Sequence, residues 1–266
     1  MKIGIFDSGL GGLLIAEAIR EHLPQYDYIY LGDTLHVPYG KRSAAAITEY
    51  TKRSIQYLFD EDCQLVILAC NTASAAALRT LQQQYLPQTF PERRILGVVV
   101  PMIETALGHK AQNIGLIGTD FLIRSKIYEQ ELTKIDPNVK LLHKATPLLV
   151  PLLESHASKW IEPILRDYIT PLIENNIDAL MLGCTHYAAL VPHLQNMLPA
   201  EINILSQHKI IPPCLEDYLH RHQEHENKLS KTANIRYLLT DITDDYDDTI
   251  AALLGKHITF EHISTL

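Results

Sequence analysis

Short apolar runs alternate with longer amphipathic stretches along the first half of the chain. The apolar runs cover residues 2–6, 28–31 and 65–69, and the stretches with helical character cover 13–19, 43–59 and 73–85. A continuous apolar run of this length is typical of a strand that is buried on both faces of a parallel sheet. The alternation of strand and helix therefore predicts an α/β fold with helices on both faces of the sheet.

The second half of the chain repeats this order. The apolar segment that begins at Asn113 resembles the one at Lys2, and the segment at Val139 corresponds to the one at Tyr28, each displaced by 111 residues. Two similar halves that face each other across a pseudo-twofold axis bring the carboxyl ends of their strands into one cleft, where open α/β sheets bind ligands. We expect a second domain from residues 96–207. The first domain is expected to consist of residues 1–95 and 208–266, with the tail segments 235–239, 246–254 and 258–263 packed back on it.

The composition disfavours several classes of protein. The chain has 266 residues and a net charge of −8, which argues against broad binding to nucleic acid or to an anionic membrane surface. No apolar run approaches the ~20 residues that cross a bilayer, and no signal-peptide pattern opens the chain. The four cysteines are sparse and irregularly spaced, which argues against a disulfide framework and predicts a cytoplasmic protein.

Two of the cysteines occupy matching positions at the ends of predicted strands. Cys70 follows the apolar run 65–69, and Cys184 follows a similar run in the other half. Each is expected to precede a helix, whose free N–H groups and dipole stabilise a thiolate. A buried structural cysteine is the alternative for either position, because free cysteine is among the most buried residue types. The matching contexts favour a chemical role, since two thiols on opposite sides of a substrate carbon can move a proton between its faces, as a racemase requires.

Polar and ionisable side chains stand beside both thiols in the sequence. Asp7 and Ser8 follow the first strand, where they can hold a substrate ammonium group or help a nearby thiol to exchange its proton. Their alternative role is to cap the helix that begins near Gly12. His186 follows Cys184 by two residues, and an imidazole suits proton exchange with that thiol because it titrates near neutral pH. A satisfied, partly buried histidine is the alternative at this position.

Two glycine-containing loops lie near the expected cleft. The run 9–12 (GLGG) does not match the dinucleotide-binding pattern, because Leu14 stands at the place of the third glycine. We expect these glycines to let the backbone approach a small ligand in a tight turn. In the loop 32–40, the backbone N–H groups of Tyr39 and Gly40 can bind an anion, and a plain turn is the alternative.

Two polar segments near the carboxyl end resemble metal sites only superficially. His220, His222 and His225 are spaced by two and three residues, which does not place all three on one face of a helix. We therefore expect them on a solvated surface. The acidic run 241–248 lacks the glycine of a calcium loop and predicts a loop that caps the next helix.

Several short motifs, taken together and in this order, are similar to those of the glutamate racemase family, within the aspartate/glutamate racemase superfamily. They are residues 6–12 (FDSGLGG), 32–34 (GDT), 38–43 (PYGKRS), 70–72 (CNT), 117–119 (IGT) and 183–187 (GCTHY). The resemblance extends over essentially the whole chain. It implies two α/β domains, with the first completed by the carboxyl-terminal tail, and an activity that uses neither pyridoxal phosphate nor a metal ion.

The resemblance also implies roles for individual residues. Cys184 would take the α-proton from L-glutamate while Cys70 delivers a proton to the opposite face, with His186 assisting Cys184 and Asp7 assisting Cys70. Asp7 and His186 are also expected to bind the substrate carboxylates or ammonium group, together with Ser8, Pro38, Tyr39, Gly40, Asn71, Thr72, Thr119, Glu154 and Thr185. The D-glutamate formed would serve peptidoglycan synthesis. Members of the family are often dimers, which leaves a homodimer open for this chain.

Three places differ from the family pattern. Leu122 replaces a threonine and could remove one substrate hydrogen bond, Thr146 stands where a cysteine is common, and residues 204–207 replace an Asp-Ser-Gly-like run. Two alternatives therefore stay open: a racemase of aspartate or another acidic amino acid, and a binding or regulatory protein with little turnover. A thiol redox protein is disfavoured, because the sequence contains no Cys-x-x-Cys pair.

Overall fold

The structure is a computed structural model that describes residues 1–155 and 157–264. Within these ranges the strands form two sheets, one of six strands and one of four, and all the strand pairs are parallel. The larger sheet contains β1 (Lys2–Asp7), β2 (Tyr28–Gly32), β3 (Cys63–Leu68), β4 (Arg94–Gly97), β9 (Ile235–Leu239) and β10 (Glu261–His262). The smaller sheet contains β5 (Asn113–Gly118), β6 (Lys140–Ala145), β7 (Ala179–Gly183) and β8 (Asn203–Leu205).

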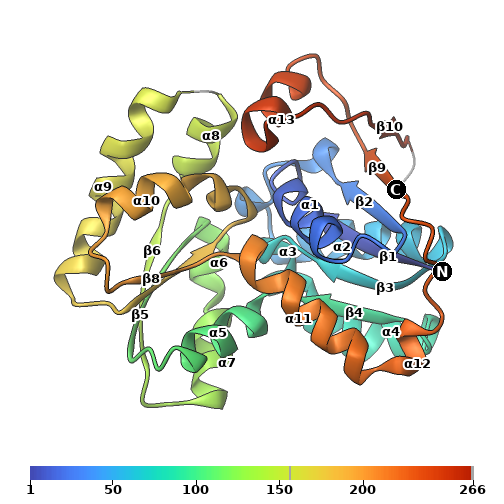
Figure 1. The fold of residues 1–266 in the computed structure, drawn as a ribbon, viewed down its shortest axis with the longest axis horizontal. Coiled ribbons are helices and arrows are strands. Elements are labelled where there is room, and N and C mark those ends of the chain that lie inside the picture. The colour runs from blue at the N-terminus through green and yellow to red at the C-terminus, as the bar shows by residue number, and fades with distance from the viewer. Residues whose placement is uncertain (156, 265–266) are drawn as a thin grey trace.

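The two sheets repeat one topology. The order β2-β1-β3-β4 in the larger sheet corresponds to the order β6-β5-β7-β8 in the smaller one, so β1 and β5 are counterparts, as are β3 and β7. The two sheets lie beside each other in Figure 1. Strands β9 and β10 come from the carboxyl-terminal tail and extend the larger sheet beyond β2. The α/β fold with two similar halves is therefore confirmed, whereas the domain boundaries 1–95 plus 208–266 and 96–207 stay a prediction.

Helices cover both faces of each sheet. Those packed on the larger sheet or beside it are α1 (Leu13–His22), α2 (Ala44–Asp60), α3 (Asn71–Thr80), α4 (Leu86–Thr89), α11 (Gln207–Arg221), α12 (Gln223–Glu226) and α13 (Tyr246–Leu254). Those of the other half are α5 (Val99–Gly108), α6 (Asp120–Ser125), α7 (Ile127–Ile135), α8 (Leu149–Glu154), α9 (Ser158–Glu174) and α10 (Val191–Met197). Short turns of 3₁₀ helix are η1 (Thr34–His36), η2 (Tyr39–Lys41) and η4 (Thr185–Leu190), and η3 (Leu81–Tyr85) is a π-helical turn.

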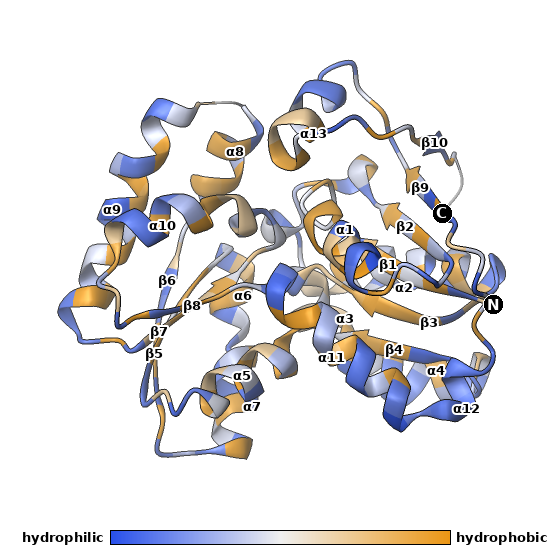
Figure 2. Ribbon diagram, viewed as in Figure 1, coloured by the Kyte–Doolittle hydropathy of each residue, from blue (hydrophilic) through white to orange (hydrophobic). Residues whose placement is uncertain are grey.

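Each sheet carries an apolar cluster on both faces, as the continuous apolar runs predict. Ile3 and Ile5 of β1 pack with α1 and α11 on one face, and Phe6 packs with α2 and α3 on the other. The smaller sheet has the same arrangement, with Leu116 in one cluster and Ile117 in the other. Figure 2 shows the apolar residues concentrated along the strands and on the inner faces of the helices. Two-sided burial of the strands stabilises the sheets and leaves their carboxyl ends free to form a site.

Two elements differ from the expectation. The helix expected over 73–85 is divided, because α3 ends at Thr80 and the chain widens into η3 before α4. Pro87 explains the change, since proline has no N–H and its ring clashes with the carbonyl four residues earlier in an α-helix. The strand expected over 258–263 is reduced to Glu261 and His262, which pair with β9 at the edge of the sheet and are both exposed.

Candidate active site

Strand ends from both halves open onto one pocket. Cys70 follows β3 and Cys184 follows its counterpart β7. Both cysteines line a pocket of about 320 Å³ that lies between the halves. The other residues expected at the site that line this pocket are Ser8, Pro38, Tyr39, Gly40, Asn71, Thr72, Thr119, Glu154, Thr185 and His186. Asp7 is not part of the lining and is only 1% exposed.

Cys70 occupies the N-terminus of α3. Its Sγ accepts a hydrogen bond from the backbone N–H of Ala73 at 3.4 Å, and the hydroxyl of Ser8 lies 3.3 Å from the same sulfur. Burial nevertheless raises the pKa of the Cys70 thiol to about 12, and the negative charge of Asp7 acts in the same direction. The N–H of Ala73 at the helix N-terminus lowers this pKa, in the expected direction, but desolvation of the charged sulfur outweighs it.

Cys184 has a different local structure. A helix follows it as expected, but this helix is the 3₁₀ turn η4, which begins at Thr185. The sulfur of Cys184 lies 3.8 Å from Nδ1 of His186. On the far side of the imidazole ring, Nε2 lies 2.9 Å from Oε1 of Glu154, which is the last residue of α8. A thiol, an imidazole and a carboxylate therefore form a chain of contacts within the second half of the protein.

The contacts of His186 favour the protonated form of its imidazole. Burial by itself lowers the pKa of His186, but the hydrogen bonds to Cys184 and Glu154 outweigh burial and raise the pKa to about 10. A cation beside a cysteine stabilises the thiolate form of that cysteine. Cys184 therefore lies beside a basic imidazole, whereas the burial of Cys70 favours its protonated thiol.

Asp7 is held by the loop that follows β1. Its Oδ2 accepts a hydrogen bond from the backbone N–H of Gly9 at 3.0 Å, whereas Oδ1 has no partner in the part of the chain that the structure describes. Burial raises the pKa of Asp7, and the charge on His186 opposes this effect. Among the described residues no hydrogen bond joins Asp7 to Cys70, so the assistance of Asp7 to this thiol stays a prediction.

Two glycines of the same loop are required by close contacts. A Cβ at Gly11 would lie 2.4 Å from Nδ1 of His186 and 2.6 Å from Oγ1 of Thr185. A Cβ at Gly12 would lie 2.3 Å from the Cβ of Asp7. No side chain fits at such distances, so the glycines let the loop lie against side chains of the site itself. Their expected role of letting the backbone approach a small ligand stays a prediction.

The loop that carries residues 38–40 is anchored by a buried carboxylate. Asp33 is fully buried, and the hydroxyl of Tyr39 donates a hydrogen bond to its Oδ2 at 2.5 Å. Oδ1 of Asp33 accepts a second hydrogen bond, from the hydroxyl of Thr240 at 2.9 Å. The loop is therefore fixed by its polar contacts, while the binding of an anion by its backbone N–H groups stays a prediction.

Two polar contacts join the halves beside the pocket. The hydroxyl groups of Thr72 and Thr119 lie 3.0 Å apart, with one on each side of the pocket. The ammonium group of Lys41 lies 2.6 Å from the carboxylate of Asp120, in an ion pair that also lies in the pocket lining. These contacts connect the start of α3 to the end of β5, and η2 to the start of α6, so they hold the two halves together around the site.

The departures from the family pattern have different structural consequences. Leu122 is 1% exposed and fills the space beside Gly118 and Gly183, and it does not line the pocket. Thr146 does line the pocket, and its hydroxyl lies 2.6 Å from the hydroxyl of Tyr187. Leu122 therefore lies outside the pocket wall, and its effect on a substrate hydrogen bond stays a prediction. Thr146 and Tyr187, in contrast, form a polar pair in the pocket wall.

The apolar wall of the pocket was not predicted from the sequence motifs, and it consists of Val37, Pro147, Val150 and Pro151. Val150 and Pro151 belong to α8, which also carries Glu154. The signal that could have located them is their position in the same apolar run as Glu154, one helical turn earlier.

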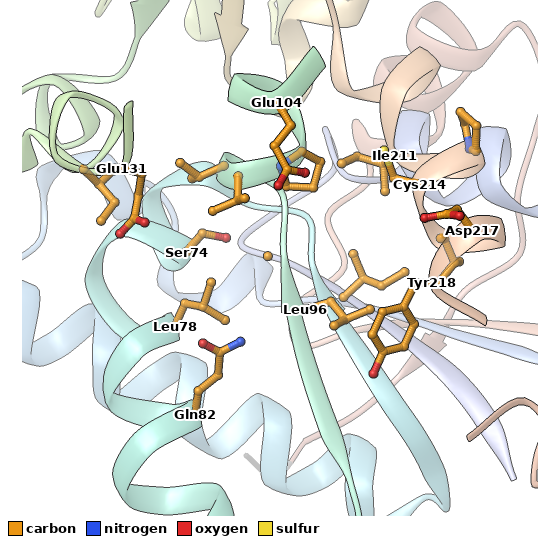
Figure 3. Close-up of a pocket in the computed structure, with 18 of the residues that line it drawn as sticks. Ser74, Leu78, Gln82, Leu96, Glu104, Glu131, Ile211, Cys214, Asp217 and Tyr218 are labelled. Carbon is orange, nitrogen blue, oxygen red and sulfur yellow. The ribbon is translucent and has the colours of Figure 1, made fainter. Parts of the chain in front are cut away.

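A second cavity, of about 460 Å³, shares none of its lining with this pocket. Figure 3 shows Ser74 and Leu78 of α3 on one side of the cavity and Ile211 and Tyr218 of α11 on the other. Helix α3 contributes residues to both cavities. The larger cavity holds a single cysteine, Cys214, so the paired thiols belong to the smaller one.

The carboxyl-terminal histidines are not all on a solvated surface as expected. His225 is 3% exposed, because its ring stacks on Tyr218 and its Nδ1 lies 3.1 Å from the amide of Gln64. Among residues 1–155 and 157–264, no group of three or more His, Cys, Asp or Glu side chains is arranged to hold a metal ion. Within the same residues, no helix combines the length and the apolar character needed to cross a membrane.

A duplicated parallel α/β fold that presents one thiol from each half to a shared pocket defines a racemase, which is a class of isomerase. The chain belongs to the Asp/Glu/Hydantoin racemase family, whose family model matches residues 14–210. This result confirms the resemblance that the sequence motifs indicated.

Named relatives and solved structures agree with this family. The chain is 36% identical to the glutamate racemase of Aquifex aeolicus, over 97% of this chain and 96% of that protein. It is 33% identical to the glutamate racemase of Dinoroseobacter shibae over the full length of both. Its fold is similar to that of the glutamate racemase from Francisella tularensis in complex with D-glutamate, with a TM-score of 0.87, 28% sequence identity and coverage of 99% and 97% of the two chains.

Proposed function

We propose that this protein interconverts L-glutamate and D-glutamate by moving the α-proton between Cys70 and Cys184. The observation that carries the proposal is that the two thiols line one pocket from counterpart strand ends of the two halves. The relatives are glutamate racemases, and the Francisella enzyme was crystallised with D-glutamate, which supports glutamate as the substrate.

The difficulty of this reaction is that a proton next to a carboxylate is only weakly acidic. Without charge delocalisation by another group, the barrier must be lowered by positioning and by electrostatic stabilisation of the developing negative charge. The pocket contains suitable donors in the hydroxyl groups of Thr72, Thr119 and Thr185 and in the backbone N–H groups of Tyr39 and Gly40. We assign these groups to the substrate carboxylates.

The proton moves in two steps. In the direction from L- to D-glutamate, the thiolate of Cys184 forms an S–H bond as the C–H bond breaks, and the electron pair stays on the α-carbon and its carboxylate. The thiol of Cys70 then delivers its proton to the opposite face, which forms the new C–H bond and leaves a thiolate on Cys70. The reverse reaction runs through the same steps in the opposite order, so no proton is gained or lost overall.

The neighbours of each thiol fit these two starting states. The imidazolium of His186, supported by Glu154, stabilises the thiolate of Cys184 that removes the proton. Burial keeps Cys70 protonated until it acts, since the pKa of its thiol is raised to about 12. The hydroxyl of Ser8, 3.3 Å from the sulfur of Cys70, can donate a hydrogen bond to the thiolate formed afterwards.

Three further expectations belong to the same proposal. The D-glutamate produced would supply peptidoglycan synthesis, the enzyme would act in the cytoplasm, and it would do so as a monomer or as a homodimer. The peptidoglycan role and the oligomeric state follow from the family resemblance, and the location follows from the sparse, irregularly spaced cysteines. An activity on aspartate or another acidic amino acid is the competing outcome, and racemisation assays followed by circular dichroism with both enantiomers of glutamate and aspartate distinguish the two.

Exchange of the α-hydrogen in heavy water tests the two thiols separately. Cys70→Ser is expected to abolish racemisation while the variant still exchanges the α-hydrogen of L-glutamate, because Cys184 reaches that face. Cys184→Ser is expected to show the converse behaviour with D-glutamate. The matched control is Cys214→Ser, because Cys214 lines the other cavity and should leave both rates unchanged.

Two results would contradict the proposal. Racemisation by Cys70→Ser at the rate of the unmodified enzyme is incompatible with two acid–base thiols. A complete lack of exchange with any amino acid in the unmodified enzyme indicates a binding or regulatory protein.

A further inference from the structure

A buried cluster of three polar side chains adjoins Cys70. Nδ2 of Asn71 donates a hydrogen bond to Oε1 of Gln207 at 3.0 Å, and Nε2 of Gln207 donates one to Oδ1 of Asn71 at 2.8 Å. The hydroxyl of Tyr128 donates a third hydrogen bond to the same oxygen of Asn71, also at 2.8 Å. Each of the three residues is only 2% exposed, so solvent does not compete for these contacts.

The cluster connects the pocket to parts of the chain that lie outside it. Asn71 is the first residue of α3 and lines the pocket beside Cys70. Tyr128 belongs to α7 of the second half, and Gln207 is the first residue of α11, which returns the chain to the first half. Neither Tyr128 nor Gln207 lines the pocket. The orientation of a pocket side chain is therefore set from outside the pocket.

The chemistry of a primary amide makes this orientation important. Rotation of the Asn71 side chain by a half-turn exchanges its N–H donors with its carbonyl acceptor. Two donors are directed at Oδ1, and a rotation of the Asn71 amide alone would bring its N–H group against the Nε2 donor of Gln207. One N–H of Asn71 is used by Gln207, and within the described residues the second has no acceptor.

We propose that Gln207 is a positioning residue for the racemase reaction. Together with Tyr128, it holds the amide of Asn71 so that the remaining N–H is offered to a substrate carboxylate next to Cys70. Without this lock the amide can turn its oxygen toward an anion, which repels it. The inference rests on the proposed function. Gln207 also lies in the segment 204–207, where the sequence departs from the family pattern.

The first test is Gln207→Met, which preserves the length of the side chain and removes both hydrogen bonds to Asn71. The KM for L-glutamate is expected to rise about tenfold, with a much smaller change in kcat, because a lost contact made equally in the ground and transition states weakens binding alone. Gln64→Met is the matched control. Gln64 is 1% exposed, and its amide donates to the backbone of Glu92 at 2.7 Å, away from the pocket. The control is expected to lower the melting temperature without a change in KM.

The second test asks whether Gln207 acts through Asn71. If it does, Gln207→Met causes no further increase in KM when it is added to Asn71→Ala, so the two changes are not additive. Tyr128→Phe removes only one hydroxyl, and it replaces Gln207→Met as the test variant if Gln207→Met does not fold. It is expected to raise KM about threefold.

The outcomes separate the two proposals. The positioning role is overturned if KM is unchanged in both Gln207→Met and Tyr128→Phe. It is also overturned if Gln207→Met raises KM by the same factor in the unmodified enzyme and in Asn71→Ala. Either result leaves the racemase function intact. Failure of the unmodified enzyme to racemise glutamate overturns the proposed function instead, and the inference with it.

Discussion

The contact between His186 and Glu154 allows a direct test of the electrostatics at Cys184. Glu154→Gln preserves the shape of the side chain and removes the negative charge that lies 2.9 Å from Nε2 of His186. Burial lowers the pKa of His186, and the contacts with Cys184 and Glu154 raise it to about 10. Loss of the Glu154 charge must therefore lower this pKa, so that His186 loses its proton at a lower pH. Cys184 then loses its cationic neighbour at that lower pH as well.

The size of the shift in the pKa of His186 follows from Coulomb's law and from the exposure of the His186 and Glu154 side chains. Two unit charges about 4 Å apart interact by about 1 kcal/mol in water and about 4 kcal/mol at an effective dielectric constant of about 20. The side chain of His186 is 8% exposed but that of Glu154 is 43% exposed, so solvent screening brings the interaction close to the lower value. An interaction of about 1–2 kcal/mol moves a titration by about one pH unit.

The assay is the pH dependence of kcat/KM for L-glutamate, which should be bell-shaped. We expect its alkaline limb to begin about one pH unit lower in Glu154→Gln than in the unmodified enzyme. The control is Glu162→Gln, because Glu162 forms the same kind of pair with His193, at 3.2 Å and outside the pocket. An alkaline limb that stays in place in Glu154→Gln, or that moves equally in Glu162→Gln, refutes the reasoning.

Two further predictions concern packing and stability. Gly11→Ala is expected to lower kcat by about tenfold to hundredfold and to destabilise the fold by about 1–3 kcal/mol, because its Cβ would lie 2.4 Å from Nδ1 of the buried His186 and would displace that ring. Measurements of kcat and melting temperature check this prediction. Glu17→Gln is expected to destabilise the fold by about 2 kcal/mol at neutral pH, since the buried carboxylate of Glu17 accepts hydrogen bonds from Arg20 and Lys256. Burial raises the pKa of Glu17 but these partners lower it overall, so the stabilisation is present above pH 4.5 and is lost as the pH falls below it. The urea midpoints of Glu17→Gln and of the unmodified protein should therefore differ in neutral buffer and converge in acid. Equal midpoints in neutral buffer contradict the prediction.

The strands and the location of the site could be predicted because their signals are local. The runs 2–6, 28–31 and 65–69 are continuous and apolar, and each forms a buried strand. The repeat of this order in the second half made Cys70 and Cys184 counterparts. Because the carboxyl ends of parallel strands share one edge of a sheet, counterpart strands in facing halves direct both cysteines to the same pocket.

The properties of the site residues could not be predicted in the same way, because they depend on distant parts of the chain. The helix after Cys70 was expected, but the burial that raises the pKa of its thiol comes from packing that no local pattern encodes. The amide pair of Asn71 and Gln207 joins residues 136 positions apart. Leu122 illustrates the same limit, since its residue type does not reveal that its side chain points toward Gly118 rather than into the pocket.

The different neighbours of the two thiols have a chemical reason. Transfer of a proton between two faces of a carbon requires one thiolate and one thiol, and two identical environments would favour the same state for both. In the proposed reaction, the imidazole of His186 lies beside the thiol that removes the proton, and burial favours the protonated form of Cys70. Asp7 supports this state from both sides, because its charge raises the pKa of Cys70 and interacts favourably with the charge of His186. In the proposed reaction, these neighbours suit the state that accepts L-glutamate.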